Sequence, residues 1–290
     1  MRPVPVTRPA YLAESPVWDA GRQTLLWVDI MAGDVHRLDP ASGEDASTRA
    51  GVPVGAVAVR RGGGLVLAAG LGFATFDEQA GTLTWLWDGG LGDRMNDGKC
   101  DPAGRFLAGT LTYAREPGAC ALYRLESGQL EGERVSHVFG GVTLSNGLGW
   151  SPAGDLLYYA DTALERVDVL DYDPASGEAG GRREFIDLHD APGRPDGLTV
   201  DSDGAVWIAM AGGSAVRRYA SDGRLDLVIE FPVRLVTSVT FGGAGLGDLY
   251  VTTSREGLSP ADLAGQPLAG SVFVVSDSGF RGRPTEEFAG

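Results

Sequence analysis

The chain has 290 residues, of which 43% are hydrophobic and 22% are charged, a composition typical of a globular protein with a sizeable buried core. Its formal net charge of -15 argues against nucleic acid or an anionic membrane as a partner, because both bind basic surfaces. The same charge is compatible with a divalent cation or with a small-molecule substrate.

The apolar segments are the length of strands, and none approaches the length of a transmembrane helix. The first residues, "MRPVPVTRPAYLAESP", lack the apolar stretch of a secretory signal, so the expected location is cytoplasmic. Cys100 and Cys120 are then expected to be reduced thiols, with a disulfide between them as the disfavoured alternative. The expected assembly is a monomer or a small homo-oligomer.

Six similar segments follow one another along the chain. Each has a turn that contains glycine, a short strand, a polar break, a second alternating strand and another glycine turn. Their anchor glycines are separated by 43, 40, 50, 50 and 43 residues and are Gly21, Gly64, Gly104, Gly154, Gly204 and Gly247. A strand-rich repeat of about 40–50 residues is typical of a β-propeller with one four-stranded blade per repeat. The sequence therefore predicts an all-β fold, a single six-bladed β-propeller domain over residues 1–290 with a central channel.

The strand segments support this prediction. "LLWVDI", "LLYYADT", "AVWIAM" and "DLYVTT" are rich in β-branched and aromatic residues and are flanked by Gly, Asp and Pro. A helical turn is expected only within residues 259–266, "SPADLAGQ".

Four polar residues interrupt the repeats at corresponding places. In chain order they are Glu14 in "LAESPVW", Asn96 in "RMNDGKCDPAG", Asn146 in "LSNGLGWSP" and Asp196 in "RPDGLTVDSDG". The last three lie at fifty-residue intervals, each with a glycine one or two residues later. Asn96-Asp97-Gly98 is expected to form a tight turn, and Asn146 and Asp196 are expected directly before a strand. All four should lie at the same end of their blades, near the central axis.

Each of these residues also has an ordinary structural interpretation. Asn-Gly and Asp-Gly pairs are typical turn residues that tolerate positive φ, and a lone Glu in a strand is commonly solvated. Four oxygen-bearing side chains around one axis are harder to explain in this way, because buried carboxylates need a partner. Oxygen ligands without Cys or His suit a hard ion such as Ca²⁺, Mg²⁺ or Mn²⁺.

The motifs together resemble the senescence marker protein, gluconolactonase and regucalcin family. The resemblance extends from about Pro9 to the C-terminus and includes "ESPVW", "RMNDGKCDPAGRFLAGT", "LSNGLGWSPAGDLLYYADT", "RPDGLTVDSDGAVWIA" and "LAGSVFVV", in this order. It implies a six-bladed propeller with one divalent cation in the channel, held by Glu14, Asn146 and Asp196. The ligand set tolerates Ca²⁺, Mg²⁺, Mn²⁺ and Zn²⁺.

The resemblance also implies roles for the remaining candidate residues. Arg94 and Asn96 would contact the hydroxyl groups of a sugar, and Glu116 on the following loop would contribute to substrate binding. Tyr113 and Arg115 are alternatives to Glu116, because this loop is the least certain part of the match. Asp196 would also act as the general base.

The implied activity is metal-dependent hydrolysis of a sugar 1,4- or 1,5-lactone to the aldonic acid. Two alternatives stay open, a phosphotriesterase or aryl-esterase and a non-catalytic calcium-binding regulatory protein. His36, His137 and His189 are expected in blade strands or outer loops, which disfavours a Ser-His-Asp hydrolase.

Overall fold

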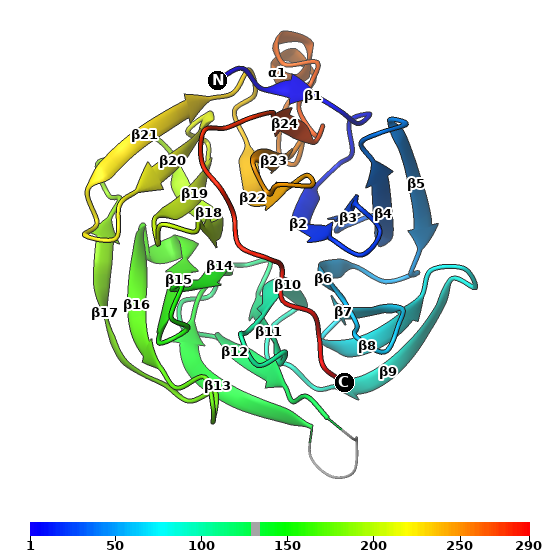
Figure 1. Cartoon of the computed structure of the whole chain (residues 1–290), viewed down its shortest axis with the longest axis vertical. Helices are drawn as coiled ribbons and strands as arrows, with labels where there is room; N and C mark the ends of the chain where they lie inside the picture. Colours follow the sequence, from blue (N-terminus) through cyan, green and yellow to red (C-terminus); the bar gives the residue numbers. More distant parts are fainter. Residues whose placement is uncertain (129–133) are drawn as a thin grey trace.

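The strands form a closed ring of six sheets. The computed structural model describes residues 1–128 and 134–290, and in these residues twenty-four strands form six four-stranded sheets. Viewed down the shortest axis, the sheets radiate from the centre of the molecule (Figure 1). The predicted six-bladed β-propeller is confirmed.

The first three blades follow the chain in order. Blade 1 contains β2 (Ala13–Asp19), β3 (Thr24–Asp29), β4 (Asp34–Asp39) and β5 (Glu44–Arg49). Blade 2 contains β6 (Val54–Val59), β7 (Leu65–Ala69), β8 (Gly72–Asp77) and β9 (Thr82–Asp88). Blade 3 contains β10 (Arg94–Cys100), β11 (Phe106–Leu111), β12 (Cys120–Leu125) and β13 (Val135–Val142).

The remaining blades include two short helices between strands. Blade 4 contains β14 (Ser145–Trp150), β15 (Leu156–Asp161), β16 (Arg166–Tyr172) and β17 (Ala179–Asp187), with the 3₁₀ turn η1 (Thr162–Leu164) after β15. Blade 5 contains β18 (Arg194–Val200), β19 (Val206–Ala211), β20 (Ala215–Tyr219) and β21 (Leu225–Glu230). Blade 6 contains β22 (Val236–Gly242), β23 (Asp248–Thr253), β24 (Phe273–Val275) and β1 (Val4–Pro5), with α1 (Pro260–Gly265) after β23.

Blade 6 joins the two ends of the chain. The strand β1 pairs with β24 in antiparallel register, with Val4 opposite Val274 and Pro5 opposite Phe273. The outermost strand of the last blade is therefore the first strand of the chain, and this pairing closes the ring.

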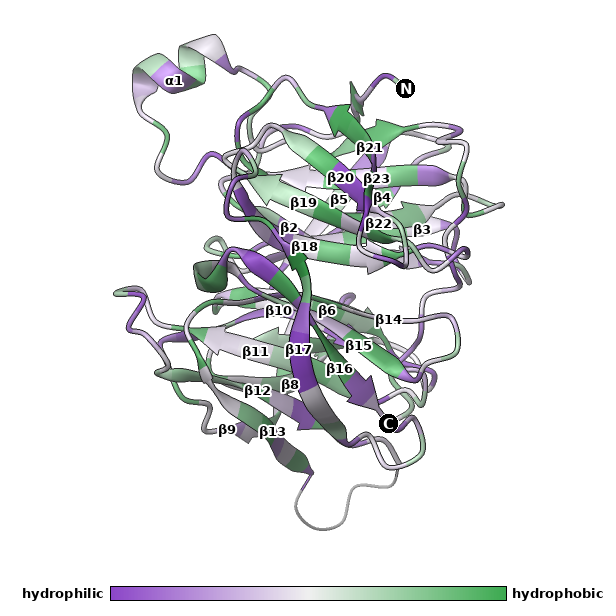
Figure 2. Ribbon diagram, turned by 90° about the vertical axis from the view of Figure 1, so that its left-hand side faces the viewer, coloured by the Kyte–Doolittle hydropathy of each residue, from purple (hydrophilic) through white to green (hydrophobic). Residues whose placement is uncertain are grey.

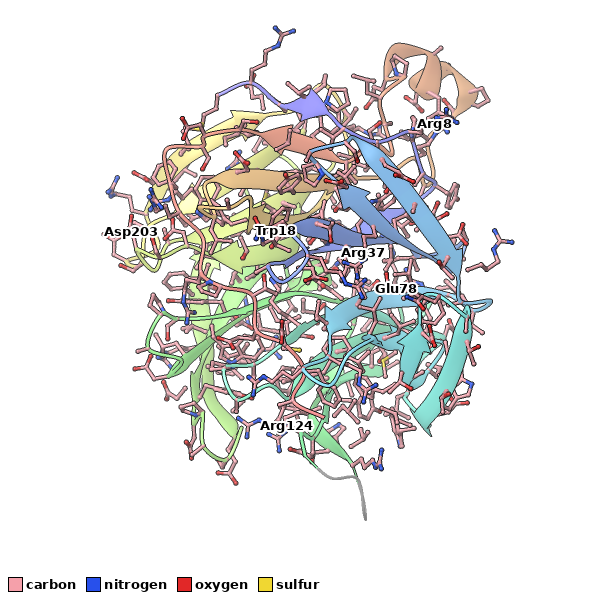
Figure 3. All side chains as sticks on the ribbon, turned by 45° about the vertical axis from the view of Figure 1, so that its right-hand side comes forward. Arg8, Trp18, Arg37, Glu78, Arg124 and Asp203 are labelled. Atoms are coloured by element: carbon pink, nitrogen blue, oxygen red, sulfur yellow. The ribbon has the colours of Figure 1, made fainter. Side chains whose placement is uncertain are left out.

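The core lies between the blades. Each blade packs on a neighbour through both faces, so inner strands such as β3 and β15 are buried on nearly every residue, whereas the outermost strand β5 is largely exposed. Trp207 of blade 5 packs edge-on against Phe241 of blade 6, with ring centroids 5.4 Å apart. Blades 1 and 2 are also joined by Arg37, whose Nε and Nη2 donate to the two carboxylate oxygens of Glu78 at 3.0 and 2.8 Å (Figure 3).

Buried aspartates hold the turns that follow β10 and β18. Asp101 accepts hydrogen bonds from the backbone N–H groups of Ala103 and Arg105, from Arg105 Nε at 2.6 Å and from the hydroxyl of Tyr172 at 2.5 Å. One hundred residues later, Asp201 occupies the corresponding position in blade 5. The repeated "DPAG" and "DSDG" segments therefore form turns, as predicted.

The two faces of the ring differ. Residues after β24 run across the middle of one face (Figure 1), where Ser202 N–H donates to Arg281 O, Arg283 Nη1 to Ser151 O and Phe288 N–H to Val59 O. The helix α1 lies on the opposite face (Figure 2). Among the described residues, no helix is long and apolar enough to span a bilayer.

Both cysteine thiols are expected to resist modification in the folded protein. Cys100 and Cys120 are free and buried, which agrees with the expectation of unpaired thiols, and burial raises the pKa of both. Because the thiolate is the nucleophile, an aromatic disulfide reagent at about pH 8 should react with neither thiol until a denaturant unfolds the chain. Reaction in the native state at the rate seen after unfolding would contradict this prediction.

Candidate functional site

The innermost strand of every blade is irregular at one level of the channel. The pairing of β2 with β3 skips from Glu14 to Val17, and that of β10 with β11 skips from Met95 to Gly98. The corresponding breaks in β14 and β18 follow Ser145 and Pro195. Such β-bulges locally bend a strand and redirect its side chains. Asn96, Asn146 and Asp196 lie within these bulges, and Glu14 lies at the edge of one.

The glycines that follow Asn146 and Asp196 are not turn glycines with positive φ. A Cβ atom on Gly147 would lie 2.5 Å from Asp196 O, and one on Gly197 would lie 2.1 Å from Ser238 Oγ. These glycines permit adjacent innermost strands to approach closely, and neither has a positive φ. The expectation of a tight turn at Asn96-Asp97-Gly98 is wrong, because these residues lie within β10. Asn146 and Asp196 likewise lie inside β14 and β18 rather than before a strand.

A cavity of about 610 Å³ opens at this level of the channel, a size within the range of small-molecule sites. Its wall includes Glu14, Arg94, Asn96, Asn146 and Asp196, from blades 1, 3, 4 and 5. The sequence-predicted convergence of these residues at one end of the channel is therefore confirmed.

A directed chain of hydrogen bonds fixes the two amides. Arg94 Nη1 donates to Asn96 Oδ1 at 2.6 Å, and Asn96 Nδ2 donates to Asn146 Oδ1 at 3.0 Å. Asn146 Nδ2 donates to Thr162 Oγ1 at 2.6 Å, whose hydroxyl donates to Pro195 O at 2.8 Å. The Oδ1 atom of Asn146 accepts one of these hydrogen bonds and keeps a second lone pair, because an amide oxygen has two.

The two carboxylates of the site, Glu14 and Asp196, both have raised pKa values. Burial raises the pKa of Glu14 well above its usual value, and repulsion from Asp196 and Asp97 adds to the effect. Burial likewise raises the pKa of Asp196, with a further contribution from Asp97. Arg94 favours the charged form of both carboxylates but is a smaller influence. The carboxylates of Glu14 and Asp196 therefore repel each other, and a cation bound beside both would relieve this repulsion.

The residues present fit a hard divalent cation. Glu14 and Asp196 contribute carboxylate oxygens, and Asn146 contributes the amide oxygen oriented by Asn96 and Thr162. In residues 1–128 and 134–290, no group of three His, Cys, Asp or Glu side chains is placed to hold a metal ion, so this candidate site depends on an amide as its third ligand. Carboxylate and amide oxygens are ligands that Ca²⁺, Mg²⁺ and Mn²⁺ prefer.

The loop between β11 and β12 contributes different residues from the one predicted. Tyr113 and Arg115 line the cavity, whereas Glu116 is exposed and does not belong to the cavity wall. The backbone N–H of Glu116 donates to Thr112 Oγ1 at 2.8 Å, which anchors the loop. Of the three candidates that the sequence left open on this loop, the structure brings Tyr113 and Arg115 to the site.

The histidines lie away from the cavity. His36 is in β4, where its ring stacks on Trp27 with centroids 3.7 Å apart, and His137 is in β13. His189 is exposed, with Nδ1 3.1 Å from Glu165 Oε2. None of them lines the cavity, as expected from the sequence.

Sequence reasoning missed two threonines that support the site. Thr162 fixes the Asn146 amide, and Thr237 lines the cavity while its hydroxyl donates to Ala13 O at 2.6 Å, next to Glu14. Thr162 follows Asp161 at the end of β15, and Thr237 follows Val236 at the start of β22. Nothing in the repeat pattern distinguishes them from the other threonines of the chain.

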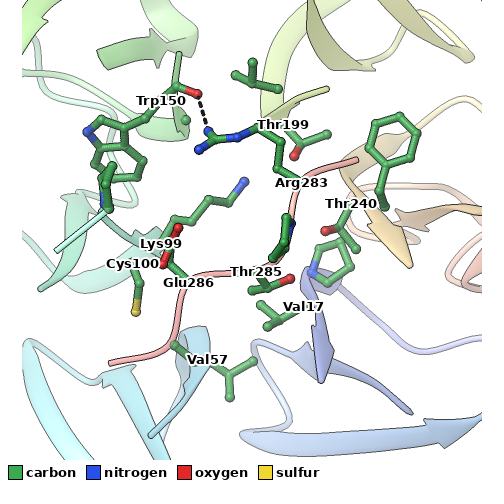
Figure 4. A pocket seen from close by; sticks show the side chains of 17 residues that line it. Val17, Val57, Lys99, Cys100, Trp150, Thr199, Thr240, Arg283, Thr285 and Glu286 are labelled. Atoms are coloured by element: carbon green, nitrogen blue, oxygen red, sulfur yellow. Dashed lines mark hydrogen bonds between the residues drawn. The ribbon is translucent and has the colours of Figure 1, made fainter. Parts of the chain in front are cut away.

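A second cavity, of about 80 Å³, occupies the other end of the channel (Figure 4). Lys99, Cys100, Arg283 and Glu286 contribute to its wall, and Lys99 Nζ donates to Leu198 O at 2.7 Å. Lys99 therefore faces away from the larger cavity although it is only three residues from Asn96. The dashed line in Figure 4 marks Arg283 Nη1 donating to Trp150 O at 3.3 Å, which ties the segment after β24 over this cavity.

Comparisons with known proteins identify relatives of the whole chain. The family model described as SMP-30/Gluconolactonase/LRE-like region matches residues 12–255, which include the five predicted residues of the cavity wall. Regucalcin of Xenopus laevis is 36% identical over 288 residues, covering 96% of this chain and 95% of the relative.

Two solved structures extend the comparison. A calcium-binding protein, regucalcin, from Agrobacterium tumefaciens matches with a TM-score of 0.91 and 28% identity, over 98% of this chain and 96% of that chain. A gluconolactonase from Xanthomonas campestris matches with a TM-score of 0.75 over 94% of this chain and 88% of that chain, and at 22% identity this likeness shows a shared fold.

Proposed function

We propose, since this chain belongs to the SMP-30/gluconolactonase/LRE-like family, that it hydrolyses the ester bond of a sugar lactone to give the aldonic acid. The observation that carries the proposal is one cavity whose wall combines a hard-cation ligand set with buried hydrogen-bond donors for a polyhydroxylated substrate. The proposed ligands are Glu14, Asn146 and Asp196. A divalent cation held by them would supply positive charge that polarises a carbonyl and increases the acidity of a nearby water.

Asp196 is the proposed general base. Its carboxylate lies in the cavity wall and belongs to a bulge that is held by the close approach of β14 and β18. As the oxygen of water forms a bond to the lactone carbonyl carbon, Asp196 takes up the proton of that water. The ring C–O bond then breaks, and the proton passes to the departing alkoxide to give the hydroxyl group of the acid.

Arg94 and Asn96 are the proposed binding residues for the sugar. Arg94 is 5% exposed, and its Nη1 is already bonded to Met95 O and Asn96 Oδ1, which leaves the guanidinium in one orientation. A donor group that is fixed in advance binds a hydroxyl at a smaller entropic cost than a mobile one. Tyr113 and Arg115 line the same cavity from the loop after β11, and they are proposed to contact the substrate in place of Glu116.

A panel of aldonolactones tests the proposal. Acid release is measured with metal-stripped protein, and then with Ca²⁺, Mg²⁺, Mn²⁺ or Zn²⁺ restored in turn. We expect turnover that is lost on chelation and restored by at least one ion, because the ligand set accepts hard divalent cations. The absence of turnover above the spontaneous rate with every ion, in folded protein that binds the ion, would exclude the lactonase.

That negative outcome would favour a second candidate function. Both the Xenopus laevis relative and the Agrobacterium tumefaciens structure carry the name regucalcin, and the latter is described as a calcium-binding protein. Calcium binding at Glu14, Asn146 and Asp196 without hydrolysis is therefore the alternative. Calorimetric binding of Ca²⁺ by a protein that turns over no lactone would support it.

A further inference from the structure

The wall of the larger cavity has a charge that differs from the rest of the protein. Four arginines line it, against three carboxylates, and the seven residues are Arg94, Arg115, Arg194, Arg234, Glu14, Asp196 and Glu256. Taken from the totals of 24 Lys+Arg and 39 Asp+Glu, these leave 20 and 36 for the rest of the chain, a net charge of -16. The cavity wall therefore has a net charge of +1 in a strongly acidic protein, before any cation is bound.

Two of the arginines, one at the start of β18 and one in the connection between β21 and β22, flank the end of β19. Arg194 begins β18 and is paired with Ala211 at the end of β19. The carbonyl of Arg234 accepts the N–H of Gly212 at 3.0 Å, and Leu235 forms a β-bridge with Ala211. The backbones of Arg194 and Arg234 thus pair with the consecutive residues Ala211 and Gly212, which brings the two arginines close together. The exposed arginines of the cavity wall, Arg115, Arg194 and Arg234, are called the rim.

The guanidinium groups at the rim have free hydrogen-bonding capacity. Arg194 Nη2 contacts Glu165 Oε1 at 3.0 Å, and its side chain is 53% exposed. Within residues 1–128 and 134–290, no ion pair holds the exposed side chains of Arg115 and Arg234. Deeper in the cavity wall, Arg94 Nε is buried and has no hydrogen-bond partner among the described residues. An unpaired buried donor of this kind is costly unless a ligand satisfies it.

We propose that the lactone carries an anionic group, a carboxylate or a phosphate, at the end of its carbon chain farthest from the reacting carbonyl. This proposal rests on the proposed function, because it places the carbonyl near Asp196 and the anionic group at Arg194 and Arg234. Arg194 precedes Asp196 by two residues on β18, which places their Cα atoms at most roughly 7 Å apart, because the bulge after Pro195 can only shorten the extended distance. That separation is within the length of a single sugar unit.

The chemistry of the rim fits this substrate class better than a neutral one. A guanidinium group presents paired N–H donors that match the oxygens of a carboxylate or a phosphate, whereas a neutral hydroxyl needs no cation. An anion that approaches a protein with a net charge of -15 is repelled over most of the surface, so local positive charge at the entrance is required for efficient capture. Glu256 opposes this effect, but it is exposed and outnumbered by the arginines.

Three lactones with the same carbon skeleton test the proposal in the ion-loaded protein. They are the neutral glucono-1,5-lactone, a glucarolactone with a terminal carboxylate and 6-phosphoglucono-1,5-lactone with a terminal phosphate. We expect kcat/KM for at least one anionic lactone to exceed that for the neutral lactone by about tenfold or more, since a charge-assisted pair is stronger than a neutral hydrogen bond. The preferred anionic lactone identifies the source of the charge.

The double variant Arg194→Gln/Arg234→Gln is expected to lower the ratio of anionic to neutral kcat/KM by about tenfold, and raised salt should lower the ratio in the unchanged protein. The matched control is Arg183→Gln, because Arg183 is exposed on β17 and pairs with Asp171 at 2.9 Å, away from the cavity. A preference for the neutral lactone, or a ratio that the double variant leaves intact, would overturn the proposal.

A binding measurement separates this proposal from the lactonase activity. Glucarate, 6-phosphogluconate and gluconate are titrated calorimetrically into the ion-loaded protein. If no lactone is hydrolysed but an anionic ligand binds more tightly than gluconate and loses this advantage in the double variant, the anion site stands and the lactonase fails. If neutral lactones are hydrolysed best and gluconate binds as tightly as the other two, the lactonase stands and the anion site is excluded.

Discussion

Replacing Asp196 with asparagine is expected to lower kcat for lactone hydrolysis by roughly a hundredfold to ten-thousandfold, the usual contribution of a general base. The amide keeps the shape of the side chain but cannot take up a proton from water. It also removes one of the two negative charges of the proposed ligand set, so the affinity for the divalent cation should fall as well. The rate is therefore measured at saturating ion, after the affinity of the variant has been determined calorimetrically.

The control for this experiment is Asp203→Asn in the same blade. Asp203 lies at the outside of the molecule (Figure 3), and its side chain is 74% exposed. The same chemical change there should leave both ion affinity and turnover as they were. If Asp196→Asn retains the full rate at saturating ion, Asp196 is not the base, and another group must accept the proton.

Replacing Asp101 with alanine is expected to lower the free energy of unfolding by about 3–5 kcal/mol, the range found when one partner of a buried ion pair is removed. Asp101 is fully buried, and Arg105 Nε donates to it at 2.6 Å. The substitution leaves Arg105 without its carboxylate, and it also removes the acceptor of the Tyr172 hydroxyl and of two backbone N–H groups. Urea unfolding followed by tryptophan fluorescence measures the change.

Asp39→Ala is the matched control for that measurement. Asp39 also caps a turn, since it accepts hydrogen bonds from Ala41 N–H and Ser42 Oγ. This turn is exposed, however, and among the described residues no ion pair joins Asp39 to an arginine. Its loss should destabilise the protein much less. Equal effects of the two substitutions would show that the turn hydrogen bonds, rather than the buried Asp101–Arg105 pair, are what matters.

The fold could be predicted from the sequence because the blades repeat similar turn and strand residues. The anchor glycines Gly64, Gly104, Gly154 and Gly204 all have positive φ, which a Cβ atom disfavours, so the turns that they form leave a regular trace in the sequence. The short helix was predicted within residues 259–266, and α1 occupies Pro260–Gly265 with Ser259 as its N-cap. Local rules of this kind do not depend on contacts between distant residues.

The immediate surroundings of the site were not predictable in the same way. Gly147 and Gly197 follow Asn and Asp as turn glycines do, yet they lie in strands and are needed because a neighbouring strand leaves no space for a Cβ atom. That requirement depends on a contact between blades, which the sequence of one blade does not contain. The sequence also did not show that Tyr113 and Arg115, rather than Glu116, line the cavity. The reason is similar, because the path of the loop after β11 decides which side chain reaches the cavity.

The pairing of β1 with β24 also bears on how the chain reaches its native state. Val4 can pair only after Val274 has been synthesised, so the ring cannot close until residue 274 has left the ribosome. Contacts of such large sequence separation are slow to form, because the entropy of closing the loop is lost before the contact is gained. Blades 1 to 5 are each built from consecutive strands and can assemble as they emerge, with the edge of blade 1 exposed in the meantime. Completion of blade 6 is then the step that converts an open array of sheets into a closed ring around the central cavity.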